Sequence, residues 1–74
     1  MAEIEIKSEI AGKVWLIEAE AGATVEEDDP VIILESMKME IPVPAPFDGT
    51  LVEICVAEGD AVDEGDVVAR MNED

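Results

Sequence analysis

The chain has 74 residues, 49% hydrophobic but only 3% aromatic, so it can form one small domain with an aliphatic core. Asp and Glu number 20 against 4 Lys and Arg, giving a formal net charge of −16. This acidity excludes nucleic acid as a partner, because phosphate binding requires clustered positive charge. The chain has no histidine, which excludes histidine-based metal sites, catalytic triads and histidine general-base chemistry.

Cysteine content and hydropathy bear on the cellular compartment. Cys55 is the only cysteine and cannot form a disulfide within the chain, so we expect a reducing, cytoplasmic compartment. No apolar run approaches the length of a membrane span, and no membrane association is expected. Residues 1–5 lack the basic start and apolar stretch of a secretory signal.

The first half of the chain predicts short β-strands separated by turns. Residues 3–7 alternate polar and apolar side chains, which is typical of a half-buried strand. The segments that follow are a second strand at 13–19, a turn at 20–22, a short segment at 23–25, an acidic loop at 26–29, Pro30 and a buried apolar run at 31–34.

A short polar tip, centred on Met37 and Lys38, separates the apolar run 31–34 from a proline-rich run at 41–46. Two β-prone runs around so short a tip predict a tight hairpin. Two-residue hairpin turns favour Asn-Gly or Asp-Gly, because both central residues need positive φ. Met37 and Lys38 are not among the residues that adopt positive φ readily. A local departure from turn preference indicates a functional site.

The chain also contains an internal repeat. Its matching residues are separated by 37 positions and are the pairs Gly12 and Gly49, Gly22 and Gly59, Val25 and Val62, and Glu27 and Glu64. Two copies predict one barrel or sandwich whose halves are related by a pseudo-two-fold axis. Adding 37 to the number of Lys38 gives a position one past the last residue, so the symmetry makes the hairpin tip equivalent to the end of the chain. The tip should therefore project from the end of the barrel opposite the termini.

The repeat carries finer predictions. Apolar positions in each copy have an odd spacing, which a regular strand cannot place on one face, so we expect a β-bulge that leaves Glu53 outside. By the same count the side chain of Cys55 should face outward or be only partly buried. The four repeated glycines are expected in turns: Gly12, Gly22, Gly49 and Gly59.

Proline spacing after the tip predicts an edge strand. Pro42, Pro44 and Pro46 stand at alternate positions, and alternate residues direct their backbone N–H groups to the same side. Because proline lacks this donor, one side of the strand cannot pair with another strand.

The Met37-Lys38-Met39 motif, with the downstream run 44–46 (Pro-Ala-Pro) and Asp48-Gly49, resembles the biotin-attachment site of biotin carboxyl carrier domains. Residues 1–74 as a whole resemble a single biotinyl/lipoyl domain. The resemblance implies an all-β fold, a flattened barrel-sandwich of two four-stranded antiparallel sheets with internal pseudo-two-fold symmetry, called a hammerhead fold.

The resemblance implies covalent attachment of biotin to Lys38 by a biotin protein ligase. The biotin would then carry a carboxyl group between a biotin carboxylase and a carboxyltransferase of a biotin-dependent carboxylase or decarboxylase, for example an acyl-CoA carboxylase. Met37 and Met39 suit recognition at the tip because methionine is flexible and polarizable, and the resemblance adds Glu35 as a ligase contact. No catalytic or metal-binding residue is expected, and the domain itself should be monomeric.

Two alternatives to a biotin carrier remain open. Lys38 could be an ordinary exposed lysine in an unmodified interaction module. The chain could also be a lipoyl carrier of a 2-oxoacid dehydrogenase-type complex, although lipoyl domains usually place Asp before and Ala after the lysine.

Among biotin carriers, the short segment from Gly12 to Gly22 leaves no room for the thumb of the common bacterial acetyl-CoA carboxylase carrier. Carriers of propionyl-CoA, methylcrotonyl-CoA or pyruvate-type carboxylases are the closer resemblance.

Overall fold

The computed structural model describes residues 3–73; residues 1, 2 and 74, which the expected domain includes, lie outside the described residues. Within this range the chain forms eight β-strands. They are β1 (Glu3–Lys7), β2 (Gly12–Ile17), β3 (Thr24–Val25), β4 (Pro30–Ser36), β5 (Met39–Pro44), β6 (Gly49–Ile54), β7 (Ala61–Val62) and β8 (Val67–Glu73).

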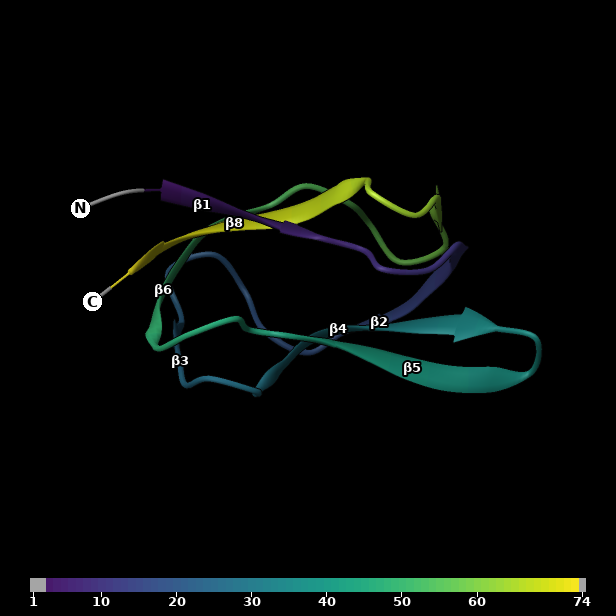
Figure 1. The fold of residues 1–74 in the computed structure, drawn as a ribbon, viewed down its shortest axis with the longest axis horizontal. Coiled ribbons are helices and arrows are strands. Elements are labelled where there is room, and N and C mark those ends of the chain that lie inside the picture. The colour runs from purple at the N-terminus through teal and green to yellow at the C-terminus, as the bar shows by residue number, and fades with distance from the viewer. Residues whose placement is uncertain (1–2, 74) are drawn as a thin grey trace.

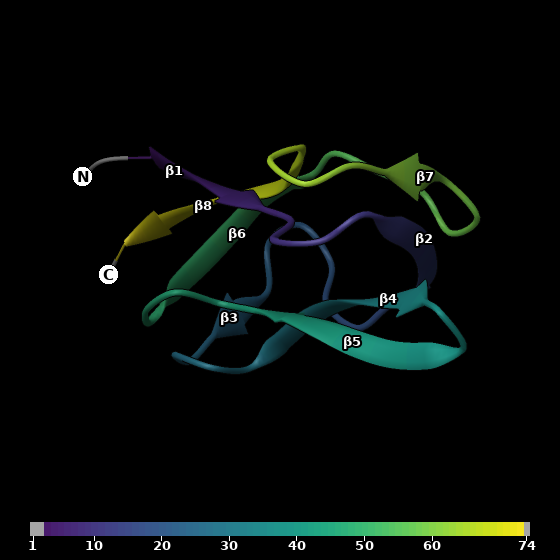
Figure 2. The ribbon, with the colours of Figure 1, turned by 45° about the vertical axis from the view of Figure 1, so that its right-hand side comes forward.

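The strands form two four-stranded antiparallel sheets, as predicted (Figures 1 and 2). One sheet has the order β1-β8-β6-β3, and the other has the order β5-β4-β2-β7. Aliphatic side chains from both sheets fill the core between them, and those of Ile32, Leu34, Leu51 and Met71 are completely or almost completely buried. The first predicted strand, residues 3–7, is confirmed as β1, while the second begins one residue earlier and ends two residues earlier than expected.

The hydrogen bonds of the backbone follow the sequence repeat. The Gly22 N–H donates to the Leu51 carbonyl at 2.7 Å, and the Gly59 N–H donates to the Val14 carbonyl at the same 2.7 Å. The donors are 37 residues apart and so are the acceptors, in opposite directions along the chain, as a two-fold exchange of the halves requires. Gly22 and Gly59 lie in turns with φ of 92° and 95°, which confirms their predicted role.

The prediction of turns at Gly12 and Gly49 is wrong. These two glycines open β2 and β6, and neither has positive φ. A Cβ atom at Gly49 would collide with the carbonyl oxygen of Asn72, and one at Gly12 would lie 2.9 Å from the carbonyl oxygen of Glu35. Glycine is needed here because a neighbouring backbone passes too close for a side chain.

The predicted β-bulge is present in both halves. The β2–β4 register shifts between Val14 and Leu16, and the β6–β8 register shifts between Leu51 and Glu53. Glu53 and Cys55 are exposed, as the odd spacing of apolar residues predicts.

Strand β5 is an edge strand, as the prolines predict. Ser36 and Met39 pair across the two-residue turn, and Pro42 lies opposite Ile33. Because hydrogen-bonded and open pairs alternate from the turn, Pro42 and Pro44 occupy open pairs and face the free edge of the sheet. This edge therefore lacks N–H donors at two successive outward positions.

The molecule is elongated, with principal extents of 36 × 17 × 17 Å. Strand β1 begins and β8 ends at one end, and the β4–β5 hairpin projects from the other (Figure 1). For the described residues the prediction is confirmed, because the hairpin tip lies opposite the start of β1 and the end of β8. No helix in the described range is long and apolar enough to cross a membrane.

Candidate functional site

The turn of the β4–β5 hairpin has an unfavourable backbone conformation. Met37 and Lys38 have φ values of 52° and 65°, the sign that a two-residue type I′ turn requires at both central positions. Such φ values cost non-glycine residues about 1–2 kcal/mol each. Strain of this kind gathers at functional sites, where the surrounding structure enforces it.

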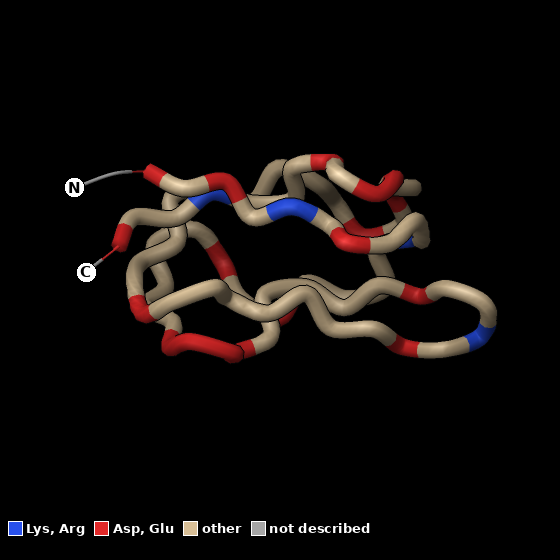
Figure 3. Tube along the Cα trace, in the orientation of Figure 1, with Lys and Arg blue, Asp and Glu red and all other residues tan. Residues whose placement is uncertain are grey.

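The side chains at the tip are turned toward solvent. Met37 is 92% exposed, Met39 is 63% exposed, and Lys38 is exposed between them. Figure 3 shows a basic segment at the hairpin tip, with an acidic segment on each of the two strands that lead to it. Neither methionine fills the core, so both are available to contact another molecule together with the lysine.

Charged residues form a row across the sheet close to the hairpin turn. Glu35 lies opposite Glu40 in the β4–β5 pairing and opposite Lys13 in the β2–β4 pairing. Residues directly opposite one another share a face of the sheet, so these three side chains lie on one face. Glu35 is exposed and stands between a like and an opposite charge, where an incoming basic group can reach it.

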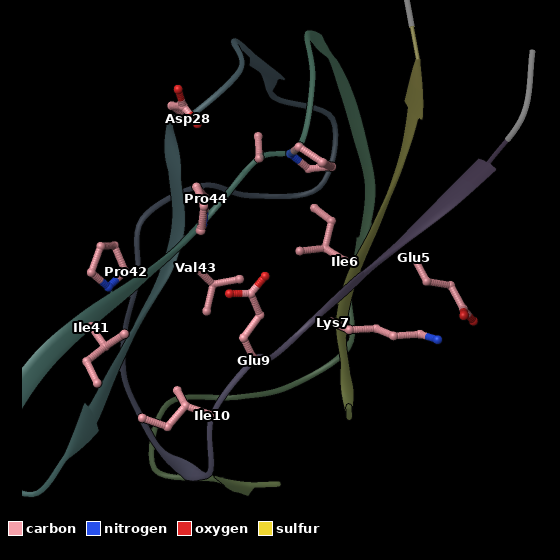
Figure 4. Close-up of a pocket in the computed structure, with 12 residues that line it drawn as sticks. Glu5, Ile6, Lys7, Glu9, Ile10, Asp28, Ile41, Pro42, Val43 and Pro44 are labelled. Atoms are coloured by element: carbon pink, nitrogen blue, oxygen red, sulfur yellow. The ribbon is translucent and has the colours of Figure 1, made fainter. Parts of the chain in front are cut away.

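A hollow of about 400 Å³ lies along the side of the barrel. It separates the edge strands β1 and β5, and in Figure 4 Ile6 and Val43 point into the space between them, while Glu5 and Lys7 point away. Its lining is mainly apolar and does not include the hairpin turn. Among residues 3–73, no group of three His, Cys, Asp or Glu side chains is placed to hold a metal ion.

The fold and the hairpin together define a class of protein. A small antiparallel sandwich presents one lysine on a strained, exposed turn, at the end opposite to that where β1 begins and β8 ends. This is the arrangement of a carrier domain, in which a lysine amine accepts a covalently attached group.

The family follows from comparison with known proteins. Residues 4–71 match the sequence profile of the family described as "Biotin-requiring enzyme", and the chain belongs to this family of biotin/lipoyl attachment domains. It is 42% identical over 67 residues to the biotin/lipoyl attachment protein of Bacillus subtilis, covering 90% of this chain and 92% of that protein.

Larger proteins contain similar domains. The crystal structure of Kluyveromyces lactis urea carboxylase matches with a TM-score of 0.92 and 38% identity, covering 97% of this chain and 6% of that one. The dihydrolipoyllysine-residue acetyltransferase component of the Corynebacterium glutamicum pyruvate dehydrogenase complex is 42% identical over 52 residues, covering 70% of this chain and 8% of that protein. The chain thus spans nearly all of a small attachment protein and a small part of multidomain enzymes.

The structure brings together the four residues that the sequence singled out. Glu35, Met37, Lys38 and Met39 all lie within the last part of one hairpin. Trp15, which no sequence pattern had singled out, lies on the same sheet and is 48% exposed. Comparison of the two copies of the repeat could have indicated it, because the second copy has a valine, Val52, at the equivalent position.

Proposed function

We propose that the chain is a biotin carrier domain and that Lys38 is its attachment site. The observation that supports this proposal is the turn itself, in which an exposed lysine is held at positive φ between two exposed methionines. A solubilising lysine would need no such conformation. The free amine is clear of the core and of the neighbouring strands, so an amide can form at Nζ without disturbing the fold.

The roles of the residues follow from this geometry. Lys38 supplies Nζ, which attacks the carboxyl group of biotin after ATP has activated it in the active site of a biotin protein ligase. The amide bond forms as the bond to the activating nucleotide breaks and the nucleotide leaves. A lysine amine attacks only through the lone pair of its unprotonated form, so the active site of the ligase must take up the proton of Nζ. Met37, Met39 and Glu35 provide the surface that the ligase recognises.

Bound biotin would supply a ring nitrogen that accepts a carboxyl group at a biotin carboxylase and gives it up at a carboxyltransferase. The domain contributes position rather than catalysis. A tether at either end of the chain would leave the hairpin free, and tethering raises the local concentration of the carried group at each active site. The exposed free thiol of Cys55 is in keeping with a reducing, cytoplasmic setting.

The methionines distinguish biotin from lipoate in this proposal. A lipoyl carrier remains the second candidate, because the family includes both and one similar relative is named as a dihydrolipoyl component. The residues that flank Lys38 are apolar and exposed, whereas lipoyl domains usually have Asp before and Ala after the lysine.

The test is attachment to Lys38 in the full chain. The wild-type protein and Lys38→Arg are each incubated with biotin protein ligase, biotin and ATP, and in parallel with a lipoate ligase. We expect the intact mass of the wild type to rise by one biotin and that of Lys38→Arg to stay unchanged. Biotin on Lys38→Arg, at Lys7 of β1 or Lys13 of β2, would refute the site, and lipoate alone on the wild type would refute the cofactor.

A further inference from the structure

The two sheets have different outer faces, although the repeat makes their backbones equivalent. On the β1-β8-β6-β3 sheet, Glu53 lies opposite Arg70. Arg70 forms ion pairs with Glu53 and with Glu3, the latter at 3.3 Å. This is the polar surface expected where an antiparallel sheet faces water.

The hairpin-bearing sheet has apolar residues at the same places. The positions equivalent to Glu53 and Arg70, 37 residues earlier, are Leu16 and Ile33, and these two also lie opposite one another. Ile33 stands between two completely buried neighbours in β4, so it points away from the core, and Leu16 shares its face. Both remain half-buried rather than covered.

Trp15 extends this apolar surface at the bulge of β2. It is 48% exposed, and its equivalent in the second half, Val52, is 36% exposed. A hollow of about 190 Å³ beside it is lined by Lys13, Val14, Trp15, Glu35 and Gly59. Trp15, Leu16 and Ile33 are called the outer apolar patch below.

Packing within the domain does not require this patch. None of its three residues belongs to the hydrophobic core or to the partly buried side chains packed against it. The second half adopts the same strand geometry with Val52, Glu53 and Arg70 in their places. An exposed apolar surface that the fold does not need marks an interaction site.

We propose that the outer apolar patch, with the row Lys13, Glu35 and Glu40, is the surface on which the ligase that modifies Lys38 docks. This inference rests on the proposed function. The ligase is the occupant because it must form a bond at Nζ of a bare lysine and must therefore close on the hairpin strands. An enzyme that acts on the far end of a long prosthetic arm needs no such approach.

The distances fit a single interface. Ile33 lies four residues from the turn, about 13 Å along an extended strand. A standard interface buries about 800 Å² on each partner, equivalent to a disc of about 16 Å radius. An interface centred near Glu35 can therefore include the turn at one side and Trp15 at the other.

Charge defines the complementary surface of the ligase. The patch is apolar, while Glu35 and Glu40 adjoin it in a domain with a net charge of −16. The ligase should therefore present an apolar centre with a basic rim, an arrangement that also speeds association at low salt.

The test is the kinetics of biotin transfer to the full chain by a biotin protein ligase. The variants copy the second half of the molecule: Trp15→Val, and the double variant Leu16→Glu with Ile33→Arg. Val52→Ala, at the equivalent position on the other sheet, is the matched control. Circular dichroism and thermal midpoints establish that each variant is folded.

For Trp15→Val we expect the KM for the chain to rise by about tenfold, the effect of removing an aromatic interface contact, with kcat unchanged at saturation. The double variant should raise KM further, and Val52→Ala should behave as the wild type.

Unchanged KM in both patch variants would overturn the docking proposal alone, because Lys38 would still be biotinylated. A wild-type dimer in sedimentation that Trp15→Val converts to monomer would also overturn it, since a second copy would then cover the patch. No biotin on the wild type would overturn the proposed function and the docking proposal together.

Discussion

Lys38 is held in a backbone conformation that its own side chain does not favour. Its φ of 65°, and the φ of 52° at Met37, are adopted because the flanking strands pair up to Ser36 and Met39 and leave only two residues to reverse the chain. The same constraint turns the Lys38 and Met37 side chains outward. In the proposed function, the lysine determines where biotin is attached, and the neighbouring side chains determine which ligase attaches it.

We therefore expect the two methionines beside Lys38 to decide between biotin and lipoate. Met37→Asp with Met39→Ala would place a charge where, in the proposed function, the biotin ligase contacts an apolar side chain, and would remove contact area beside it. The double variant should fold normally, because both methionines are exposed and little buried area is lost. We expect it to lose most of its biotinylation rate and to gain measurable lipoylation, as followed by intact mass. Biotinylation as fast as in the wild type would remove the main support for biotin over lipoate.

At the scale of the element, the β4–β5 hairpin holds the lysine at an exposed tip, and its turn is less stable than one made of residues that favour positive φ. The strands compensate through pairing that extends from Ser36 and Met39 to Pro30 and Pro44. Pro42 and Pro44 protect the free edge of β5, so the hairpin is less able to pair with another chain while its tip stays accessible.

The strain in the turn can be measured. Replacing Met37→Asn together with Lys38→Gly introduces the preferred residues of a type I′ turn. We expect the free energy of unfolding in urea to rise by about 1–3 kcal/mol, because both residues then adopt positive φ at little cost. Lys38→Arg, which keeps the strain and the charge, should unfold as the wild type does. A turn variant no more stable than the wild type would mean that the flanking strands already absorb the strain.

At the scale of the whole molecule, charge is the dominant feature. Acidic segments occur along both sheets and their connections, and basic segments are few (Figure 3). Among the described residues, Arg70 pairs with two of the carboxylates. The remaining acidic side chains repel one another within a body 17 Å across in its two shorter directions.

Salt should consequently stabilise the domain. Moderate NaCl shortens the range of this repulsion to about 10 Å or less. A gain of about 1 kcal/mol would raise the thermal midpoint by about 4–8 °C for a domain of this size. Differential scanning calorimetry from low to moderate NaCl measures the shift, and an unchanged or falling midpoint would argue against net repulsion.

The sequence alone determined the parts of this protein that depend on local pattern. Alternation of side chains located β1, the prolines identified β5 as an edge, and the unfavourable turn residues singled out Lys38. The repeat of 37 residues went further and gave the two-fold relation, the bulges and the opposition of the hairpin tip to the ends of the chain. Each of these follows from interactions between near neighbours or from copying one half onto the other.

Only the tertiary structure decided which backbones approach one another and which faces are left open. Gly49 resembled a turn glycine in the sequence, but the carbonyl of Asn72 in β8 leaves no room for a side chain there. Ile33 belongs to the apolar run that the sequence predicts as buried, but register with its neighbours turns it onto the outer face beside the hairpin. Both outcomes depend on pairing between strands distant in sequence, and a shift of one residue in that pairing exchanges the inside of a sheet for its outside.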